Sequence, residues 1–176
     1  KNQLIFRKVA DLKVKHPADE IKHNIGNIGI GPEGCRVIGG KFYGPFFTFD
    51  DEKTQATASG APVSIENAFG SVKVGAGAPG EVRVKISKRV YQGTREEAEA
   101  FARRVQITLE ETGGGLRIST NREALSREDP HVGFETALEI TLPPETGVTL
   151  KNAYGPVAVR DVAEARIDSS FDDLVL

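Results

Sequence analysis

The sequence predicts an all-β fold organised as a β-solenoid, with one inserted α-helix. Three observations support this prediction: apolar and polar residues alternate over most of the chain, a twelve-residue pattern occurs twice, and one segment has clear helical periodicity. The alternation is clearest at Val82, Val84 and Ile86, which are separated by charged residues. A period of two is the signature of a strand that buries one of its faces.

The repeated pattern is what predicts the solenoid. Val63–Val74 (VSIENAFGSVKV) and Val148–Val159 (VTLKNAYGPVAV) share alternating apolar positions on both sides of an Asn-Ala-aromatic-Gly segment. Asn and Gly adopt the unusual backbone angles of a corner, and the aromatic side chain can pack beneath it. Short rungs separated by such corners stack into a solenoid. The predicted structural corners are Asn67, Phe69, Gly70, Asn152, Tyr154 and Gly155.

A helix is predicted over about Thr94–Arg104. Thr94 and Glu97 have the spacing of a capping box, in which the Thr hydroxyl accepts a hydrogen bond from the amide of Glu97. One narrow apolar face follows at helical spacing, formed by Ala98, Phe101, Ala102 and Val105. The later charged segment 121–132 is predicted to be an exposed loop, with a short turn of helix as an open alternative.

We expect two parts in the chain. Residues 61–176 form the solenoid domain, and residues 1–60 form a β-rich N-terminal extension of unknown family. The end of the extension, residues 50–60 (DDEKTQATASG), is polar and lacks periodicity, so it is predicted to be a linker. Four aromatic residues of the extension form either an exposed contact patch or a plug over the first rung: Phe42, Tyr43, Phe46 and Phe47. We favour the plug, because repeat arrays need caps.

The composition restricts the classes of function. The 176 residues are 39% hydrophobic and 27% charged, with a net charge of −2 and both signs interspersed. Nucleic-acid binders rely on a basic field, so a nucleic-acid partner is not expected. No stretch approaches the roughly 18 apolar residues of a membrane span, so membrane association would depend on a segment outside this chain. The chain begins at Lys1 and contains no Met, which we interpret as a mature or trimmed form.

Cofactor and metal sites are not predicted. Gly29–Gly34 matches G-x-G-x-x-G, but the residues after it have the pattern of a strand and a turn, whereas a dinucleotide site needs a helix there. His16, His23 and His131 lack the spacing of metal ligands, and the single Cys35 excludes an internal disulfide and a cysteine zinc site. We therefore expect no cofactor and no metal.

Catalytic residues are not predicted either. The chain has no G-x-S-x-G segment, and its adjacent carboxylates are Asp50-Asp51 and Asp172-Asp173. Adjacent residues on a strand point to opposite faces, so neither pair forms a shared acid–base site. We expect that the protein is not an enzyme.

Two of the predicted strands have outward charges of opposite sign. Arg83, Lys85 and Arg89 share one face of a strand, and Glu135 and Glu139 share a face of another. If the two strands pair, these charges complement one another across the ladder. We interpret them as a soluble exposed sheet face rather than as a ligand site.

From about residue 61 to 176 the chain resembles the toast-rack β-strand-repeat domains of bacteria, also called the putative-adhesin family. The resemblance rests on the N-A-[FY]-G corners at 67–70 and 152–155, the inserted helix, the Leu116–Ile118 strand and Ile140–Pro143. It implies a right-handed β-helix-like domain on the outer side of a bacterial membrane, often attached to an anchor. The family has no established catalytic residues to carry over.

Three functions remain open at this stage. We expect a non-catalytic extracytoplasmic scaffold or binding surface at the bacterial cell envelope, with a protein or cell-surface partner. An alternative is a structural protein that self-assembles through open solenoid ends, with Leu174, Val175 and Leu176 as the assembly end, because an open β-edge recruits another strand. A less favoured alternative is a β-helix enzyme that acts on polysaccharide.

Overall fold

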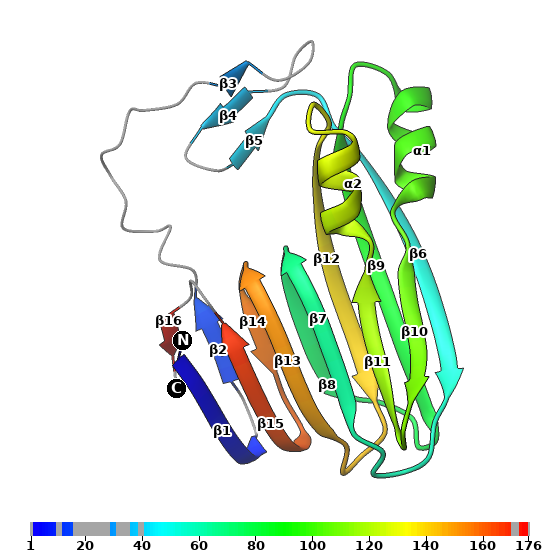
Figure 1. Ribbon diagram of the computed structural model, residues 1–176, viewed down its shortest axis with the longest axis vertical. Helices are drawn as coiled ribbons and strands as arrows, with labels where there is room; N and C mark the ends of the chain where they lie inside the picture. The colour runs from blue at the N-terminus through cyan, green and yellow to red at the C-terminus, as the bar shows by residue number, and fades with distance from the viewer. Residues whose placement is uncertain are drawn as a thin grey trace.

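The computed structural model describes residues 2–9, 12–15, 29–30, 36–38, 41–169 and 173–175, with side chains for residues 44–168. Strands dominate it, as predicted, and form two large sheets that we call sheet A and sheet B (Figure 1). Both sheets mix parallel and antiparallel pairs, and neither closes on itself.

Sheet A has six strands and sheet B has seven. The order in sheet A is β1 (Asn2–Val9), β15 (Val162–Ser169), β13 (Gly147–Tyr154), β7 (Val63–Phe69), β11 (Gly115–Thr120) and β10 (Ile107–Thr112). The order in sheet B is β16 (Asp173–Val175), β2 (Leu12–Lys15), β14 (Val157–Val159), β8 (Ser71–Ala76), β12 (Gly133–Leu142), β9 (Glu81–Tyr91) and β6 (Phe47–Ala56). A small third sheet contains β3 (Gly29–Ile30), β4 (Arg36–Ile38) and β5 (Lys41–Tyr43).

The two copies of the repeat lie side by side in parallel. Val148 is paired with Val63 between β13 and β7, and Val157 is paired with Val72 between β14 and β8. Each repeat therefore turns from sheet A into sheet B at its Asn-Ala-aromatic-Gly corner. Gly70 lies between β7 and β8, and Gly155 lies between β13 and β14.

A complete solenoid is not shown by this arrangement. In a solenoid, successive rungs follow one another in chain order, whereas here β7 lies between β13 and β11 in sheet A. The outer strands β1, β10, β9, β6 and β2 run antiparallel to their neighbours. The physical reason is that the chain after β8 returns as β9 next to β12 instead of continuing the parallel stack.

The core consists of the alternating apolar positions of both sheets. One hydrophobic cluster includes Val63 and Ile65 of β7 together with Ile86 of β9 and Ile140 of β12. Each of these side chains is at most 1% exposed, as the period of two predicts for strands with one buried face. The polar positions between them form the outer faces of the two sheets.

Two helices connect the sheets at the same end of the molecule (Figure 1). α1 (Arg95–Arg104) confirms the predicted helix: Thr94 is its N-cap and accepts a hydrogen bond from the amide of Glu97 at 3.3 Å. Its apolar residues Ala98 and Phe101 are buried. The segment predicted as a loop contains a second helix, α2 (Arg122–Glu128), between β11 and β12.

The predicted linker differs from the structure. Residues 50–56 belong to β6, which is paired along its whole length with β9, from Phe47 opposite Val90 to Ala56 opposite Glu81. Its polarity has a physical explanation, because β6 is the last strand of sheet B and most of its residues face solvent. The proposed division of the chain near residue 60 stays a prediction.

The close packing at the corners generates the first testable prediction. Gly70 has φ 108°, and a Cβ on it would lie 1.9 Å from the carbonyl oxygen of Thr136. Gly155 has φ 123°, and a Cβ on it would lie 2.2 Å from the carbonyl oxygen of Gly70. Gly155→Ala should therefore lower the free energy of unfolding by about 3 kcal/mol, from strain and backbone overlap. Urea denaturation measures this change. Gly93→Ala is the matched control, since no atom lies within 4 Å of its Cβ position, and it should change stability by less than about 0.5 kcal/mol.

Candidate functional site

The corners are held together by a ladder of buried amide side chains. Nδ2 of Asn67 donates to Oδ1 of Asn152 at 2.9 Å, and Nδ2 of Asn152 donates to the carbonyl oxygen of Gly155, also at 2.9 Å. Nδ2 of Asn67 also donates to the carbonyl oxygen of Phe69 at 3.0 Å. The backbone amide of Gly70 donates to the carbonyl oxygen of Tyr154. These contacts join the corner after β7 to the corner after β13, which indicates a structural role for the predicted corner residues.

An aromatic stack lies on the same corners. The rings of Phe69 and Tyr154 are stacked, with centroids 4.5 Å apart. The guanidinium of Arg122, from α2, lies 4.6 Å from the centroid of Phe69 and 4.6 Å from that of Phe134. In sheet A, β7 lies between β13 and β11; Tyr154 is on β13, and Arg122 begins α2, which follows β11.

Arg122 is a buried cation, only 8% exposed. Burial lowers the pKa of its guanidinium to about 10, and the charge of Glu135 acts in the opposite direction. One of its terminal nitrogens donates to the carbonyl oxygen of Phe134 at 2.8 Å. Two aromatic faces and one carbonyl therefore compensate its lost hydration. The Arg122 side chain is thus enclosed by its packing, whereas the Phe69 ring beside it is 42% exposed.

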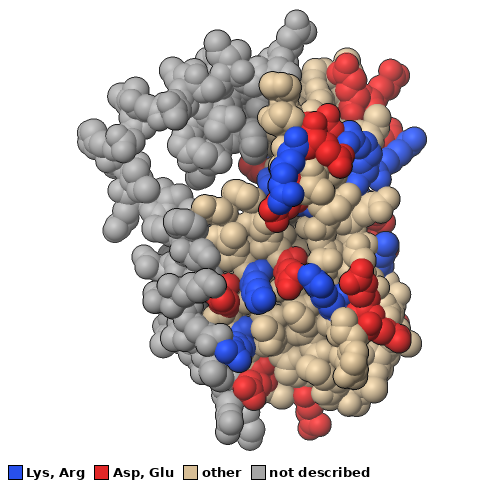
Figure 2. All heavy atoms as spheres, in the orientation of Figure 1, with Lys and Arg blue, Asp and Glu red and all other residues tan. Residues whose placement is uncertain are grey.

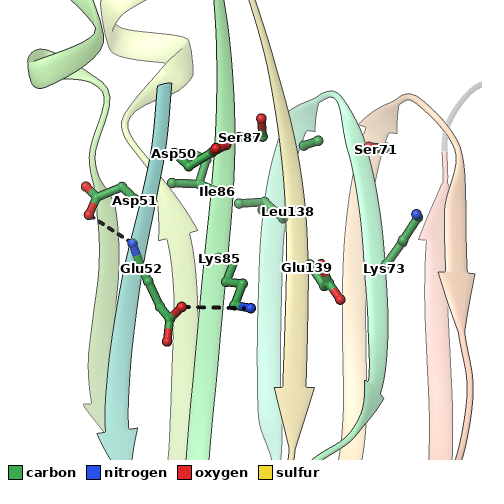
Figure 3. A pocket seen from close by; sticks show the side chains of 11 residues that line it. Asp50, Asp51, Glu52, Ser71, Lys73, Lys85, Ile86, Ser87, Leu138 and Glu139 are labelled. Carbon is green, nitrogen blue, oxygen red and sulfur yellow. Dashed lines mark hydrogen bonds and ion pairs between the residues drawn. The ribbon is translucent and has the colours of Figure 1, made fainter. Parts of the chain in front are cut away.

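The open site is a shallow groove on the outer face of sheet B. Its volume is about 630 Å³, and it crosses β6, β9, β12 and β8 (Figure 3). Its floor is a row of short side chains that are paired from strand to strand: Asp50, Ser87, Ala137 and Ser71. Two residues further along each strand, a row of long charged side chains forms one wall: Glu52, Lys85, Glu139 and Lys73. Figure 3 shows this second row aligned across the four strands.

The charged wall alternates in sign at every strand. Glu52 forms ion pairs with Arg83 at 3.4 Å and with Lys85 at 3.9 Å. Glu139 and Lys73 are paired in register but form no ion pair with any residue whose side chain the structure describes. The wall therefore contains two charged groups that are free to contact a partner.

Arg89 and Glu135 are paired in register on β9 and β12, two residues beyond Ser87 and Ala137 of the groove floor. The side chains of Arg89 and Glu135 lie 3.4 Å apart, so the charges complement one another across the paired strands. The hydroxyl of Tyr91 donates to Glu135 at 3.3 Å, and burial raises the pKa of that hydroxyl. The ring of Phe46 lies 5.7 Å from that of Tyr91 and 4.7 Å from the guanidinium of Arg89.

The predicted contact patch is thus only partly tested. Phe46 is 48% exposed beside the groove, whereas Phe47 is half-buried and packs against the core. The side chains of Phe42 and Tyr43 lie outside the described residues. Whether these residues form a patch or a plug stays a prediction.

The other residues singled out in the sequence do not converge. Leu174 and Val175 belong to β16, the terminal strand in the order of sheet B, where they pair with β2. Leu176, Cys35, His16, His23 and most of the glycine motif at 29–34 lie outside the described residues, and His131 is exposed. Within the described ranges no group of His, Cys, Asp and Glu side chains is suited to hold a metal ion. Among the same residues, neither helix is long and apolar enough to cross a membrane.

On the side of the molecule that Figure 2 shows, charges of both signs are interspersed. The fold and the groove together define a β-sheet protein with two open mixed sheets and a polar surface groove.

No family model and no curated protein matches this chain. Among solved structures it is similar to a protein of Clostridium sporogenes described as a putative cell adhesion protein. The identity is 10% and the TM-score 0.34, and the similarity covers 61% of this chain and 49% of that one. The chain thus spans about half the length of that structure. Its membership of the toast-rack family stays a prediction.

Sequence reasoning missed the groove. Its floor comes from four separate segments, and each contributes one short side chain that is unremarkable in its own segment. The available signal was the set of outward charges on β9 and β12, which we interpreted only as a soluble sheet face.

The amide ladder generates the second prediction. Asn67→Ala and Asn152→Ala should each lower the free energy of unfolding by about 2 kcal/mol, because each leaves buried polar groups without a partner. The double variant should lose less than the sum of the two, with a coupling energy of about 1 kcal/mol. A double-mutant cycle by urea denaturation measures this coupling. Additive losses would show that the two amides act independently.

Proposed function

We propose that this protein is a non-catalytic binding or scaffold module of the bacterial cell envelope, and that it contacts its protein or cell-surface partner through the outer face of sheet B. The observation that carries the proposal is the groove of about 630 Å³ across four hydrogen-bonded strands. A groove on a sheet is preorganised, so little conformational entropy is lost when a partner binds.

The lining of the groove suits a polar partner. Ser71 and Ser87 can donate and accept hydrogen bonds, Glu139 accepts them, and Lys73 donates. Glu139 and Lys73 lack an ion-pair partner among the described side chains, so binding does not require an existing pair to break. Charges of both signs favour a partner that also carries both signs, or one rich in hydroxyl and amide groups.

The groove supports binding better than catalysis. Hydrolysis of a glycoside needs an acid and a base on opposite sides of the scissile bond, roughly 5 to 9 Å apart in an enclosed site. Here Glu52 lies beside two basic side chains, and Glu139 stands in an open row on a flat sheet. An open site also leaves water free to screen every charge, which weakens electrostatic stabilisation of a transition state.

The proposed location rests on the resemblance to the toast-rack family, since the corners at 67–70 and 152–155 carry it. The strands on either side of these corners pair in parallel, β13 with β7 and β14 with β8, which supports the presence of a structural repeat. The remaining alternative, assembly through the C-terminal end, would use the edge formed by β16.

The third prediction fills the groove. Ala137→Trp places a large ring on the floor, between Ser87 and Ser71, and should weaken binding to isolated bacterial cell envelopes at least about tenfold by exclusion of the partner. Cosedimentation of the purified protein with envelopes measures the bound fraction. Ser64→Trp, at an outward position of β7 in sheet A, is the matched control and should bind as the unchanged protein does. Equal loss in both variants would contradict the proposal, as would release of sugars from envelope polysaccharide that Glu139→Gln abolishes.

A further inference from the structure

The outer face of sheet B has a charge pattern that is complementary to itself. Across β6, β9, β12 and β8 the charged wall follows the order Glu52, Lys85, Glu139, Lys73. The signs are negative, positive, negative, positive. Read in the opposite direction, every position has the opposite sign. A second copy that faces this wall in reverse order therefore places an opposite charge at each of its four positions.

This reversal is what a twofold axis produces. An axis that lies parallel to the strands, above the boundary between β9 and β12, brings Lys85 opposite Glu139 of the second copy and Glu52 opposite Lys73 of the second copy. In such an isologous interface each contact occurs twice. The wall alone then supplies four ion pairs between the copies.

The neighbouring rows agree with the same axis. Arg89 and Glu135 are paired in register on β9 and β12, so the axis places each opposite the other residue type of the second copy. In the groove row, Ser87 would face Ala137 of the second copy. The outward rows from Thr48 to Thr54 of β6 continue in register across β9 and β12, and all but the first also across β8. In none of these rows does the axis place like charges of the two copies opposite one another. Complementarity over several rows is a stronger constraint than one alternating row.

Each sheet face has both paired and unpaired charges; on sheet A, the exposed Arg166 of β15 forms no ion pair with the described side chains. On the outer face of sheet A, Glu66 is paired with Arg117 at 2.5 Å and with Lys151 at 3.9 Å. On sheet B, Glu139 and Lys73 form no ion pair with the described side chains. Both are exposed. Sheet B therefore has unsatisfied charges of both signs at the positions where a second copy would supply their partners.

We propose that the outer face of sheet B binds a second copy of this chain through a twofold axis above β9 and β12. The proposal rests on the proposed function, since it names the partner of the same face. Strand spacing of about 4.8 Å and a rise of about 3.3 Å per residue give this face roughly 400 Å² per copy. That area is below the standard size of a stable interface, so the dimer is reversible and depends on concentration and salt.

Charge exchange between copies tests the proposal. Lys73→Glu/Lys85→Glu makes the wall entirely acidic, and Glu52→Lys/Glu139→Lys makes it entirely basic. Each variant alone should be a monomer of 19.0 kDa, and an equimolar mixture should form heterodimers. Sedimentation velocity over a wide concentration range measures the masses. The unchanged protein should dimerise, and its affinity should fall at least about tenfold in about 1 M NaCl, where the Debye length is about 3 Å.

Control variants separate this effect from folding. Arg117→Glu/Lys151→Glu reverses two charges on the outer face of sheet A and should leave dimerisation unchanged. Circular dichroism confirms that every variant is folded. An unchanged protein that remains a monomer at all concentrations would overturn the proposal, and so would a mixture of the acidic and basic variants that does not associate. If self-association fails but Ala137→Trp still loses envelope binding, only the identity of the partner is wrong; if Ala137→Trp also binds normally, the proposed function fails with it.

Discussion

The hydrogen bond between the buried amides of Asn67 and Asn152 is the constraint on which the outer faces depend. It fixes the register of β7 and β13 at their neighbouring corners. There Gly70 and Gly155 allow the two backbones to approach each other closely. A slip of one residue between strands would exchange the buried and exposed faces of each strand. The rows of the groove are therefore aligned by a contact at the end of the sheets, since β8 continues directly from the corner into the groove.

Arg122 shows how the same corner is completed without a third copy of the repeat. The chain between β11 and β12 passes through α2 instead of an Asn-Ala-aromatic-Gly segment. The one amide of this segment, Asn121, hydrogen-bonds the backbone of Arg104 and Gln106. The guanidinium of Arg122 and the ring of Tyr154 both lie against the Phe69 ring, at 4.6 Å and 4.5 Å from its centroid. The cost is the burial of a charge, which is visible in the lowered pKa of Arg122. Stacking against Phe69 and Phe134 offsets part of that cost.

The sequence predicted the features that are local. Alternation identified the strands, the capping box of Thr94 and Glu97 identified α1, and the repeat identified the corners. Strand order was not predictable in the same way, because the position of β7 between β13 and β11 is set by contacts between distant segments. β6 was interpreted as a linker because an edge strand with polar residues on most positions lacks the alternation that marks a half-buried strand. The groove depends on both of these features, so it could not be predicted either.

The alternating charges on sheet B can act within one chain and between two copies of the chain. Within a single chain, opposite charges on neighbouring strands stabilise the sheet by a few tenths of a kcal/mol per pair, and they also keep the face soluble. That role is satisfied when each charge has one partner, as Glu135 and Arg89 do. It does not explain why Glu139 and Lys73 remain without a partner among the described side chains. Pairing within one chain also does not require four charges arranged evenly about the boundary between β9 and β12. Both features follow if the face is matched to a second surface with the reverse order of charges, and the reverse order is present on this chain itself.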